Sequence, residues 1–256
     1  FTEFYERELE ETGYKESSHK MYKLTLTKIK AFRKVLYFED LTYKTILDFD
    51  RWLKRQPGLG GSSIYKHHVR LRTFIKAAIR HDYIKVSNDP YTRFRPVRGE
   101  EPNRPYLNAD ELASVEALQL EDEVLERIRD LFLFCCYTGL RFGDAIRLNV
   151  SNIEHRDKGL VLRMIAEKTD KPLELPLYFL FQDGDEEGSR PERIIKKYLA
   201  ELGQLASCTG AERIRFFPYT NQYVNRTLKQ IATLAGINKN VSTHGARRTS
   251  ATQMAT

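Results

Sequence analysis

Hydrophobic residues recur at helical spacing through the first part of the chain, with lysines and arginines on the other sides of the predicted helices. This pattern is typical of helices that bury one face. The predicted helices cover residues 1–9, 17–38, 42–54 and 62–80. Ser62 or Ser63 is expected to cap the last helix, after a break at residues 57–61. Residues 1–88 are therefore predicted to form a helical bundle.

Residues 89–105 interrupt this pattern with four prolines and mixed charge, and we expect them to link two domains. The helical spacing returns in residues 106–256, where Asn108 can cap a short helix. A more buried helix is expected over residues 121–137, ended by the glycine at 139. Further helices are expected at residues 190–202, 221–234 and from 244 onward.

Between residues 153 and 177 the apolar spacing changes from helical to alternating. Residues 159–165 and 172–177 are predicted to be two strands, joined by a polar turn at residues 167–171. The expected fold class is therefore mainly α with a small β-sheet: a helical bundle followed by an α+β domain.

Charge is distributed unevenly along the 256 residues, whose net charge is +7. Residues 1–100 carry 21 Lys and Arg against 13 Asp and Glu, whereas residues 101–256 carry 21 against 22. A basic domain beside a near-neutral one suggests a polyanionic partner, most simply nucleic acid, although a basic bundle without such a partner remains an alternative. The candidate DNA-binding side chains lie on the helix at 62–80: Lys66, His67, Arg70, Arg72 and Lys76.

Several classes of protein do not fit this composition. No apolar run is long enough to span a membrane, and no signal peptide is visible. Of three cysteines, Cys135 and Cys136 are adjacent, which suits neither a disulfide framework nor a zinc site. They indicate reduced thiols and a cytoplasmic protein without a bound metal.

Arg141 follows a predicted turn at Thr138 and Gly139, so its guanidinium is expected at the start of the next helix, facing a cleft. There it could bind two phosphate oxygens, oriented by Asp144 one turn later. The alternative is an ordinary surface arginine that pairs with Asp144.

Two other segments carry candidate chemistry. Lys168 lies in the turn of the predicted hairpin, where it is either a solvated turn residue or an ammonium that enters a DNA groove and protonates a leaving oxygen. His244 and Arg247 share one face of a helix start, which favours an anion site. The alternative is a capped helix with basic side chains.

In their order, these segments resemble the motifs of the tyrosine recombinase, or phage integrase, family. Thr138-Gly-Leu-Arg141, with an acid at 144, is similar to its first arginine box, and Glu167-Lys-Thr to its lysine hairpin. His244-Gly-Ala-Arg247 is similar to its His-x-x-Arg box. The basic bundle resembles the family's SAM-like core-binding domain, so the resemblance covers nearly the whole chain. Residues 131–142 most resemble integrases of Bacteroidetes mobile elements.

The resemblance implies a site-specific recombinase that cuts and rejoins double-stranded DNA through a 3′-phosphotyrosine, without a cofactor or metal. Arg141 and Arg247 would bind the non-bridging phosphate oxygens, and Lys168 would protonate the leaving 5′-oxygen. His244 would assist proton transfer or bind a phosphate oxygen, and Asp144 would support an arginine or His244. Such enzymes act as homotetramers on paired DNA sites in the cytoplasm, associated with the nucleoid.

One departure from the family limits this interpretation. The family places another His or Trp, and then its nucleophilic tyrosine, well beyond the His-x-x-Arg box, whereas this sequence ends at Thr256. The chain is therefore expected to bind DNA without cutting it. Tyr219 and Tyr223 precede the box and are interpreted as packing residues. Three rivals stay open: a non-catalytic DNA-binding protein that regulates a recombination site, a type IB topoisomerase, and an unrelated basic helical protein.

Overall fold

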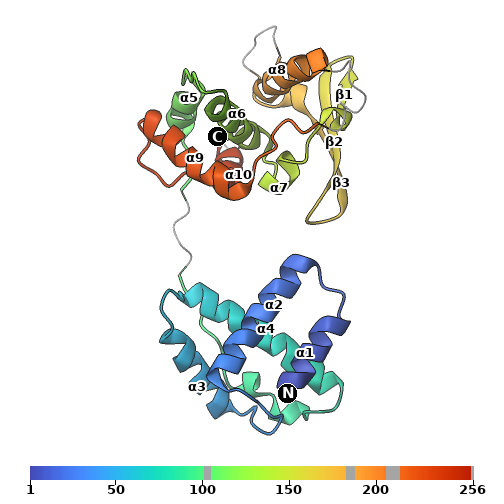
Figure 1. The fold of residues 1–256 in the computed structure, drawn as a ribbon, viewed down its shortest axis with the longest axis vertical. Helices are drawn as coiled ribbons and strands as arrows, with labels where there is room; N and C mark the ends of the chain where they lie inside the picture. The colour runs from blue at the N-terminus through green and yellow to red at the C-terminus, as the bar shows by residue number, and fades with distance from the viewer. Residues whose placement is uncertain (101–104, 183–187, 206–213, 255–256) are drawn as a thin grey trace. The chain divides into compact units, whose positions relative to one another are not determined.

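The computed structural model describes residues 1–100, 105–182, 188–205 and 214–254. Its contacts divide the chain into two units, Phe1–Pro102 and Asn103–Thr256 (Figure 1). The first unit is helical, and the second combines helices with a small antiparallel sheet. The predicted fold class is confirmed.

Unit 1 is a bundle of four helices followed by two short 3-10 turns. They are α1 (Thr2–Glu11), α2 (Glu16–Phe32), α3 (Tyr43–Lys54), α4 (Gly61–Arg80), η1 (Val86–Asn88) and η2 (Pro90–Thr92). Helix α4 packs against the other three helices, and the apolar residues at its centre, Leu71, Phe74 and Ile75, are almost fully buried. The apolar stripe of α4 thus forms the middle of the core.

Helix α2 is shorter than predicted and ends at Phe32. Arg33 is extended, and Leu36 packs into the core from the loop that follows. The backbone of Leu36 donates to the Thr2 hydroxyl at 2.9 Å and accepts from the Thr2 amide at 3.1 Å. The Leu36 backbone thus bonds to α1 and not to its own helix. The apolar spacing of residues 33–38 therefore reflects a loop that packs into the core.

Two other boundaries differ from the predictions. The residue that caps α4 is Gly60, and neither Ser62 nor Ser63 provides a side-chain cap. The expected linker at 89–105 begins too early, because Tyr91 and Phe94 are buried in the core of unit 1. The first part of the predicted linker, with Tyr91 and Phe94, therefore belongs to the fold of unit 1.

Unit 2 consists of six helices, three strands and two 3-10 turns within residues 105–182, 188–205 and 214–254. In chain order they are α5 (Ala109–Glu116), α6 (Glu123–Thr138), α7 (Phe142–Ala145), η3 (Val150–Asn152), β1 (Ile153–Arg156), β2 (Gly159–Ala166), β3 (Lys171–Pro176), η4 (Leu177–Phe179), α8 (Arg190–Leu205), α9 (Asn221–Leu234) and α10 (Thr243–Gln253). The predicted helices after residue 106 are all present.

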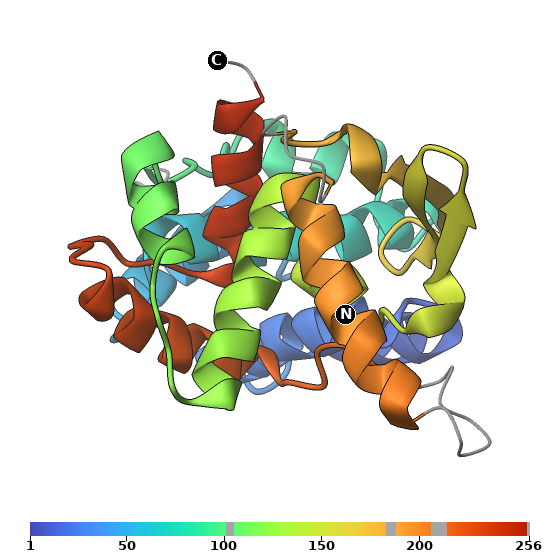
Figure 2. The same cartoon turned by 90° about the horizontal axis from the view of Figure 1, so that it is seen from above.

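Helix α6 is the centre of unit 2, and it packs against α5, α7, α8, α9 and α10. Figure 2 shows α8 and α10 on either side of it. From Ile128 to Thr138 most of its residues are buried, which explains why its sequence is apolar on nearly every side. Asn108 and Glu111 form a capping box at α5, as the sequence predicted.

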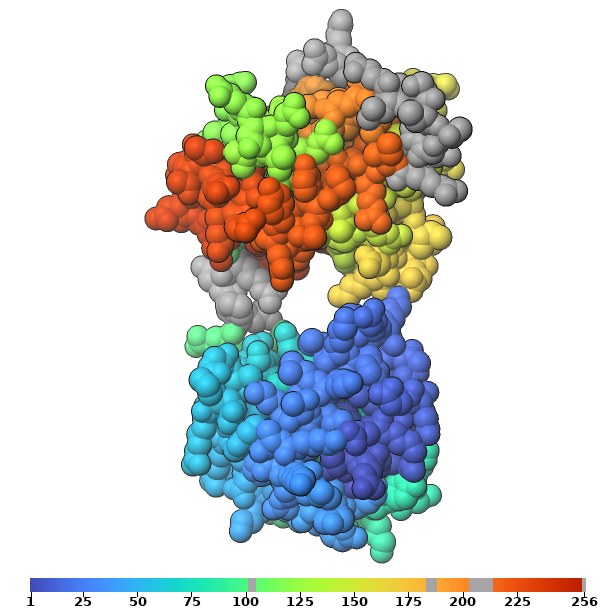
Figure 3. Space-filling model, in the orientation of Figure 1, coloured from blue at the N-terminus to red at the C-terminus, as the bar shows by residue number. Residues whose placement is uncertain are grey.

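The sheet has the strand order β1-β2-β3, with both pairs antiparallel. Strands β2 and β3 form the predicted hairpin. Strand β1 was missed because it has only four residues, two of them exposed. The turn between β2 and β3 projects from the rest of unit 2 (Figures 1 and 3).

Candidate functional site

Arg141 lies at the sharp turn where α6 ends. Gly139 stops the helix with a left-handed φ of 66°, and its amide donates to the Cys135 carbonyl at 3.0 Å. A Cβ at Gly139 would lie 3.2 Å from Ser250 Oγ of α10, so this turn packs closely on that helix. Arg141 then occupies the half-buried N-cap position of α7, as the sequence predicted.

Helix α10 carries the second arginine. The Ser242 side chain caps this helix. The Thr243 amide donates a hydrogen bond to Asn225 Oδ1 of α9 at 2.9 Å, which fixes the start of the helix. His244 is exposed in the first turn, and Arg247 is half-buried one turn later. Their spacing places both side chains on the same side of the helix.

Arg141 and Arg247 line the same cleft, which has a volume of about 240 Å³. They are far apart in the sequence, and the packing of α10 along α6 brings them together. Within the described parts of the chain, neither guanidinium forms a hydrogen bond or an ion pair. Two guanidinium groups without a protein partner at one cleft favour an anion with several oxygens.

The interior behind this cleft is apolar. Burial raises the pKa of the Cys135 thiol to about 12, while the nearby charge of Arg247 acts in the opposite direction. Cys136 is also fully buried, and burial raises its pKa well above the usual range. Both thiols are therefore protonated packing groups near neutral pH.

Asp144 has a different partner from the one expected. Its carboxylate is buried, and Oδ1 accepts the backbone amide of Glu167 at 2.9 Å. Glu167 is the first residue after β2, so Asp144 connects α7 to the base of the hairpin. This hydrogen bond supports the hairpin, whereas Asp144 was expected to support an arginine or His244.

The hairpin presents two lysines differently. Lys168 is exposed in the turn and is not among the residues that line the 240 Å³ cleft. Lys171, the first residue of β3, does line it. His244 lies outside the lining as well. Lys171 could not be recognised from spacing alone, because only the strand register shows which hairpin lysine lines the cleft with the arginines.

Four of the five candidate DNA-binding residues lie at the surface of α4 in unit 1. Lys66, Arg72 and Lys76 are exposed, and Arg70 is half-buried. His67 was predicted at this surface but is 3% exposed, and its Nδ1 lies 2.9 Å from Thr25 Oγ1 of α2. At about 100° per residue, position 67 lies opposite position 76 on the helix, so His67 faces the bundle interior and is not a surface contact.

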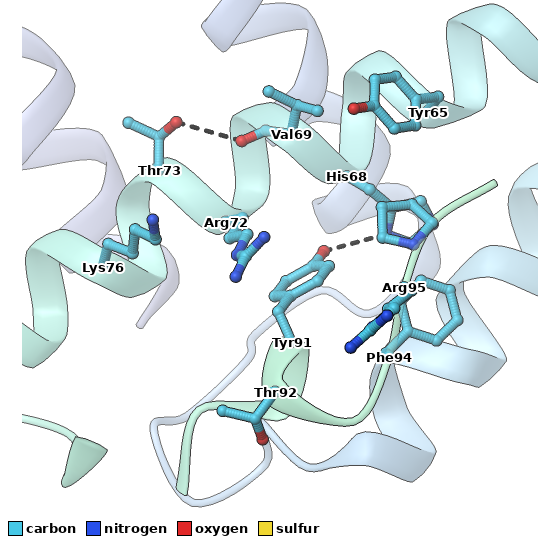
Figure 4. A pocket seen from close by; sticks show the side chains of 11 residues that line it. Tyr65, His68, Val69, Arg72, Thr73, Lys76, Tyr91, Thr92, Phe94 and Arg95 are labelled. Atoms are coloured by element: carbon cyan, nitrogen blue, oxygen red, sulfur yellow. Dashed lines mark hydrogen bonds between the residues drawn. The ribbon is translucent and has the colours of Figure 1, made fainter. Parts of the chain in front are cut away.

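A pocket of about 580 Å³ lies between α4 and the segment around η2. Arg72 and Lys76 line it from α4 and Arg95 lines it from the other wall, with Tyr91 between them (Figure 4). The Arg72 guanidinium stands 5.8 Å from the Tyr91 ring centre. No lining residue is acidic. Arg95 falls in the expected linker and was therefore not predicted as a DNA-binding residue.

The tyrosines before the His-x-x-Arg box lie at the edge of the core. Tyr219 is partly buried against it, and its ring stacks on Tyr223 at 6.0 Å. Tyr223 is 37% exposed and lies under Arg226, at 5.2 Å. Burial raises the pKa of Tyr219. Tyr219 is therefore a packing residue, as interpreted from the sequence, whereas Tyr223 is largely at the surface.

Among the residues that the structure describes, no group of three or more His, Cys, Asp or Glu is placed to bind a metal ion. Over the same residues, no helix combines the length and the apolar character that crossing a membrane requires.

The helical unit, the three-stranded sheet and the cleft with two arginines define the class of DNA strand-exchange enzymes that the motif order indicated. The chain belongs to the phage integrase family. Residues 1–95 match the phage integrase SAM-like domain, and residues 106–256 match the phage integrase family. The two matched regions correspond to the two units of the fold.

Individual relatives agree with this assignment. The chain is 25% identical over 254 residues to the tyrosine recombinase XerD of Oceanobacillus iheyensis, which covers 95% of this chain and 80% of the relative. A lambda integrase dimer bound to a COC′ core site has a TM-score of 0.74 at 19% identity, covering 98% of this chain and 85% of that one. The Tn1549 transposon integrase, in complex with transposon right end DNA, also reaches 0.74, at 14% identity, covering 99% and 86%.

Proposed function

We propose that this chain is the DNA-binding and phosphate-binding part of a site-specific recombinase that cuts and rejoins double-stranded DNA through a 3′-phosphotyrosine. The observation that carries the proposal is the convergence of Arg141 and Arg247 at one cleft, where neither has a protein partner among the described residues. A phosphodiester that is attacked gains negative charge on its non-bridging oxygens, and fixed guanidinium groups stabilise that charge.

The other site residues have complementary roles in this proposal. Lys168 is the general acid that protonates the leaving 5′-oxygen, because its exposed turn can reach a bound substrate. His244 assists proton transfer or binds a phosphate oxygen from the start of α10. Asp144 supports the reaction through the hairpin amide that it holds. The bond energy stays in the phosphotyrosine, so rejoining needs no nucleotide cofactor.

Unit 1 supplies affinity for DNA in this proposal. Lys66, Arg70, Arg72 and Lys76 on α4, with Arg95 across the pocket, contact backbone phosphates. The solved relatives include DNA complexes of dimers and of a tetramer, and we propose a homotetramer on paired sites for the full-length protein.

No tyrosine follows Arg247 in this sequence. We therefore propose that residues 1–256 alone bind DNA without cutting it, and that cleavage needs a tyrosine from outside them. A second candidate is a non-catalytic DNA-binding protein that occupies a recombination site, because the exposed Lys66, Arg72 and Lys76 of α4 can contact phosphates without any cleavage.

The test is covalent capture of DNA. The natural reading frame, extended past Thr256 to include a downstream tyrosine, is mixed with a nicked suicide duplex of its attachment site and run on a denaturing gel. A protein–DNA band is expected that disappears when the downstream tyrosine becomes phenylalanine. Arg141→Ala or Arg247→Ala should slow its formation on the order of 10²-fold.

Arg147→Ala is the matched control, since this exposed arginine follows α7 but does not line the cleft. The control should form the band at the wild-type rate. If the wild-type protein shifts the duplex in a salt-sensitive manner but forms no band, the non-catalytic candidate replaces the recombinase.

A further inference from the structure

The register of the hairpin separates its two lysines. The last paired positions are Ala166 in β2 and Lys171 in β3, and the Asp170 amide closes the turn on the Ala166 carbonyl at 2.9 Å. Lys171 therefore belongs to the hydrogen-bonded ladder. Lys168 lies beyond it, in the turn.

Lys171 shares a face with residues of the cleft. Directly opposed residues of an antiparallel pair place their side chains on the same face of the sheet. Ala166 and Lys171 both line the cleft that Arg141 and Arg247 line. Residues on an antiparallel ladder are held by backbone bonds, so the start of the Lys171 side chain is fixed relative to that face.

A hydrogen bond also connects the hairpin to the segment that carries Arg141, close to the Ala166–Lys171 pair. Asp144 accepts the amide of Glu167, the residue directly after Ala166. Asp144 lines the same cleft and follows Arg141 by one helical turn. This hydrogen bond holds the paired residues Ala166 and Lys171 near Arg141. Lys168 lies in the turn beyond the bonded Glu167 amide.

We propose that Lys171 is a third phosphate-binding cation of the cleft, which binds the same phosphodiester as Arg141 and Arg247. This inference rests on the proposed function. The tyrosine hydroxyl loses its proton to water and its oxygen attacks phosphorus, the bond from phosphorus to the 5′-oxygen breaks, and Lys168 gives a proton to that oxygen. Lys171 keeps its proton throughout and offsets the charge that develops on the non-bridging oxygens.

Substitution at each lysine with two substrates separates the two roles. The reading frame that includes the tyrosine is prepared as Lys171→Gln, Lys171→Arg and Lys168→Gln. The substrates are the suicide duplex and the same duplex with sulfur replacing the 5′-bridging oxygen at the scissile phosphate. A thiolate leaves without needing a proton, so the sulfur substrate relieves only the loss of a proton donor.

Lys171→Gln should slow adduct formation about tenfold or more on both substrates alike, and Lys171→Arg should retain most of the wild-type rate. Lys168→Gln should be slow on the oxygen substrate and recover on the sulfur substrate. Lys158→Gln, at an exposed lysine of the β1–β2 turn, is the control and should behave as wild type. Thermal unfolding of each variant checks that the fold is intact.

Three results would overturn the inference. If wild type forms the adduct and Lys171→Gln forms it at the same rate, Lys171 does not bind the phosphate. The proposed function is then unaffected. Recovery of Lys171→Gln on the sulfur substrate makes Lys171 the proton donor instead. If the wild-type protein forms no adduct with either substrate, the proposed function fails and this inference fails with it.

Discussion

The two adjacent histidines of α4 show how residue-level surroundings decide charge. His68 lies fully buried between Asp50 and Tyr91, with its ring nitrogens 3.2 and 2.9 Å from their oxygens. Burial lowers its pKa, although Asp50 acts in the opposite direction. Burial also lowers the pKa of His67 to about 4, with help from Arg70 and Lys28. Neither ring therefore adds positive charge to α4 near neutral pH.

The lowered pKa of His67 predicts a loss of stability in mild acid. The unfolded chain takes up this proton near the ordinary pKa of 6.5, and the folded chain only near 4. Stability from this residue is thus complete above 6.5 and is lost as the pH falls towards 4. Between about pH 7.5 and pH 5, the unfolding free energy of wild type should fall by up to about 2 kcal/mol more than that of His67→Gln.

Urea unfolding at both pH values measures this difference. His155→Gln, at an exposed histidine of β1, is the control and should keep the pH dependence of wild type. Identical pH dependence in wild type and His67→Gln would show that this ring is not held neutral by the fold.

At the level of elements, the link between α7 and the hairpin determines where the lysines lie. The Asp144 carboxylate is 2% exposed, so its bond to the Glu167 amide is shielded from water. A Cβ at Gly143 would lie 2.8 Å from Glu167 Oε2, which shows how closely the two elements approach. Gly143 and Asp144 therefore both contribute to the contact between α7 and Glu167 of the hairpin.

Removing this bond should loosen the hairpin without unfolding unit 2. In Asp144→Ala, the Glu167 amide should exchange with solvent on the order of tenfold faster, and Asp144→Asn should fall between it and wild type because it retains an acceptor. Amide hydrogen exchange provides the measurement. Asp157→Ala, at an exposed carboxylate of the β1–β2 turn, is the control. Unchanged exchange at Glu167 would mean that β2–β3 pairing alone holds the turn.

At the level of the whole molecule, the excess positive charge belongs to unit 1. Three cations of residues 1–100, Arg72, Lys76 and Arg95, line one pocket that has no acidic residue in its lining. Cations that contact phosphates release counterions from DNA, so each contact adds to the salt dependence of binding.

Binding of residues 1–256 to a duplex should therefore depend steeply on salt. The slope of log affinity against log salt should fall by about one for each of Arg72→Ala, Lys76→Ala and Arg95→Ala, with equal effects on different sequences. Fluorescence anisotropy over a salt series measures these slopes. Lys85→Ala, outside the pocket, is the control. A slope unchanged in the Arg95→Ala protein would exclude that residue from the DNA contact.

Local patterns were enough to predict much of this molecule. The helices of unit 2, the hairpin and the caps at Asn108 and Gly139 follow from periodicity and terminal residues, which act over a few positions. The motif order around Arg141 and Arg247 indicated the family, and the matches confirm it.

What the sequence determined by itself was therefore the local conformation of most elements and the identity of the chemical groups. Only the tertiary structure decided their partners: Asp144 binds the hairpin, His67 faces inward, α2 ends at Phe32, and Lys171 lies with the arginines. Each of these depends on contacts between segments distant in the chain. Local spacing carries no information about which distant segment will pack against a given face, so packing and register had to settle them.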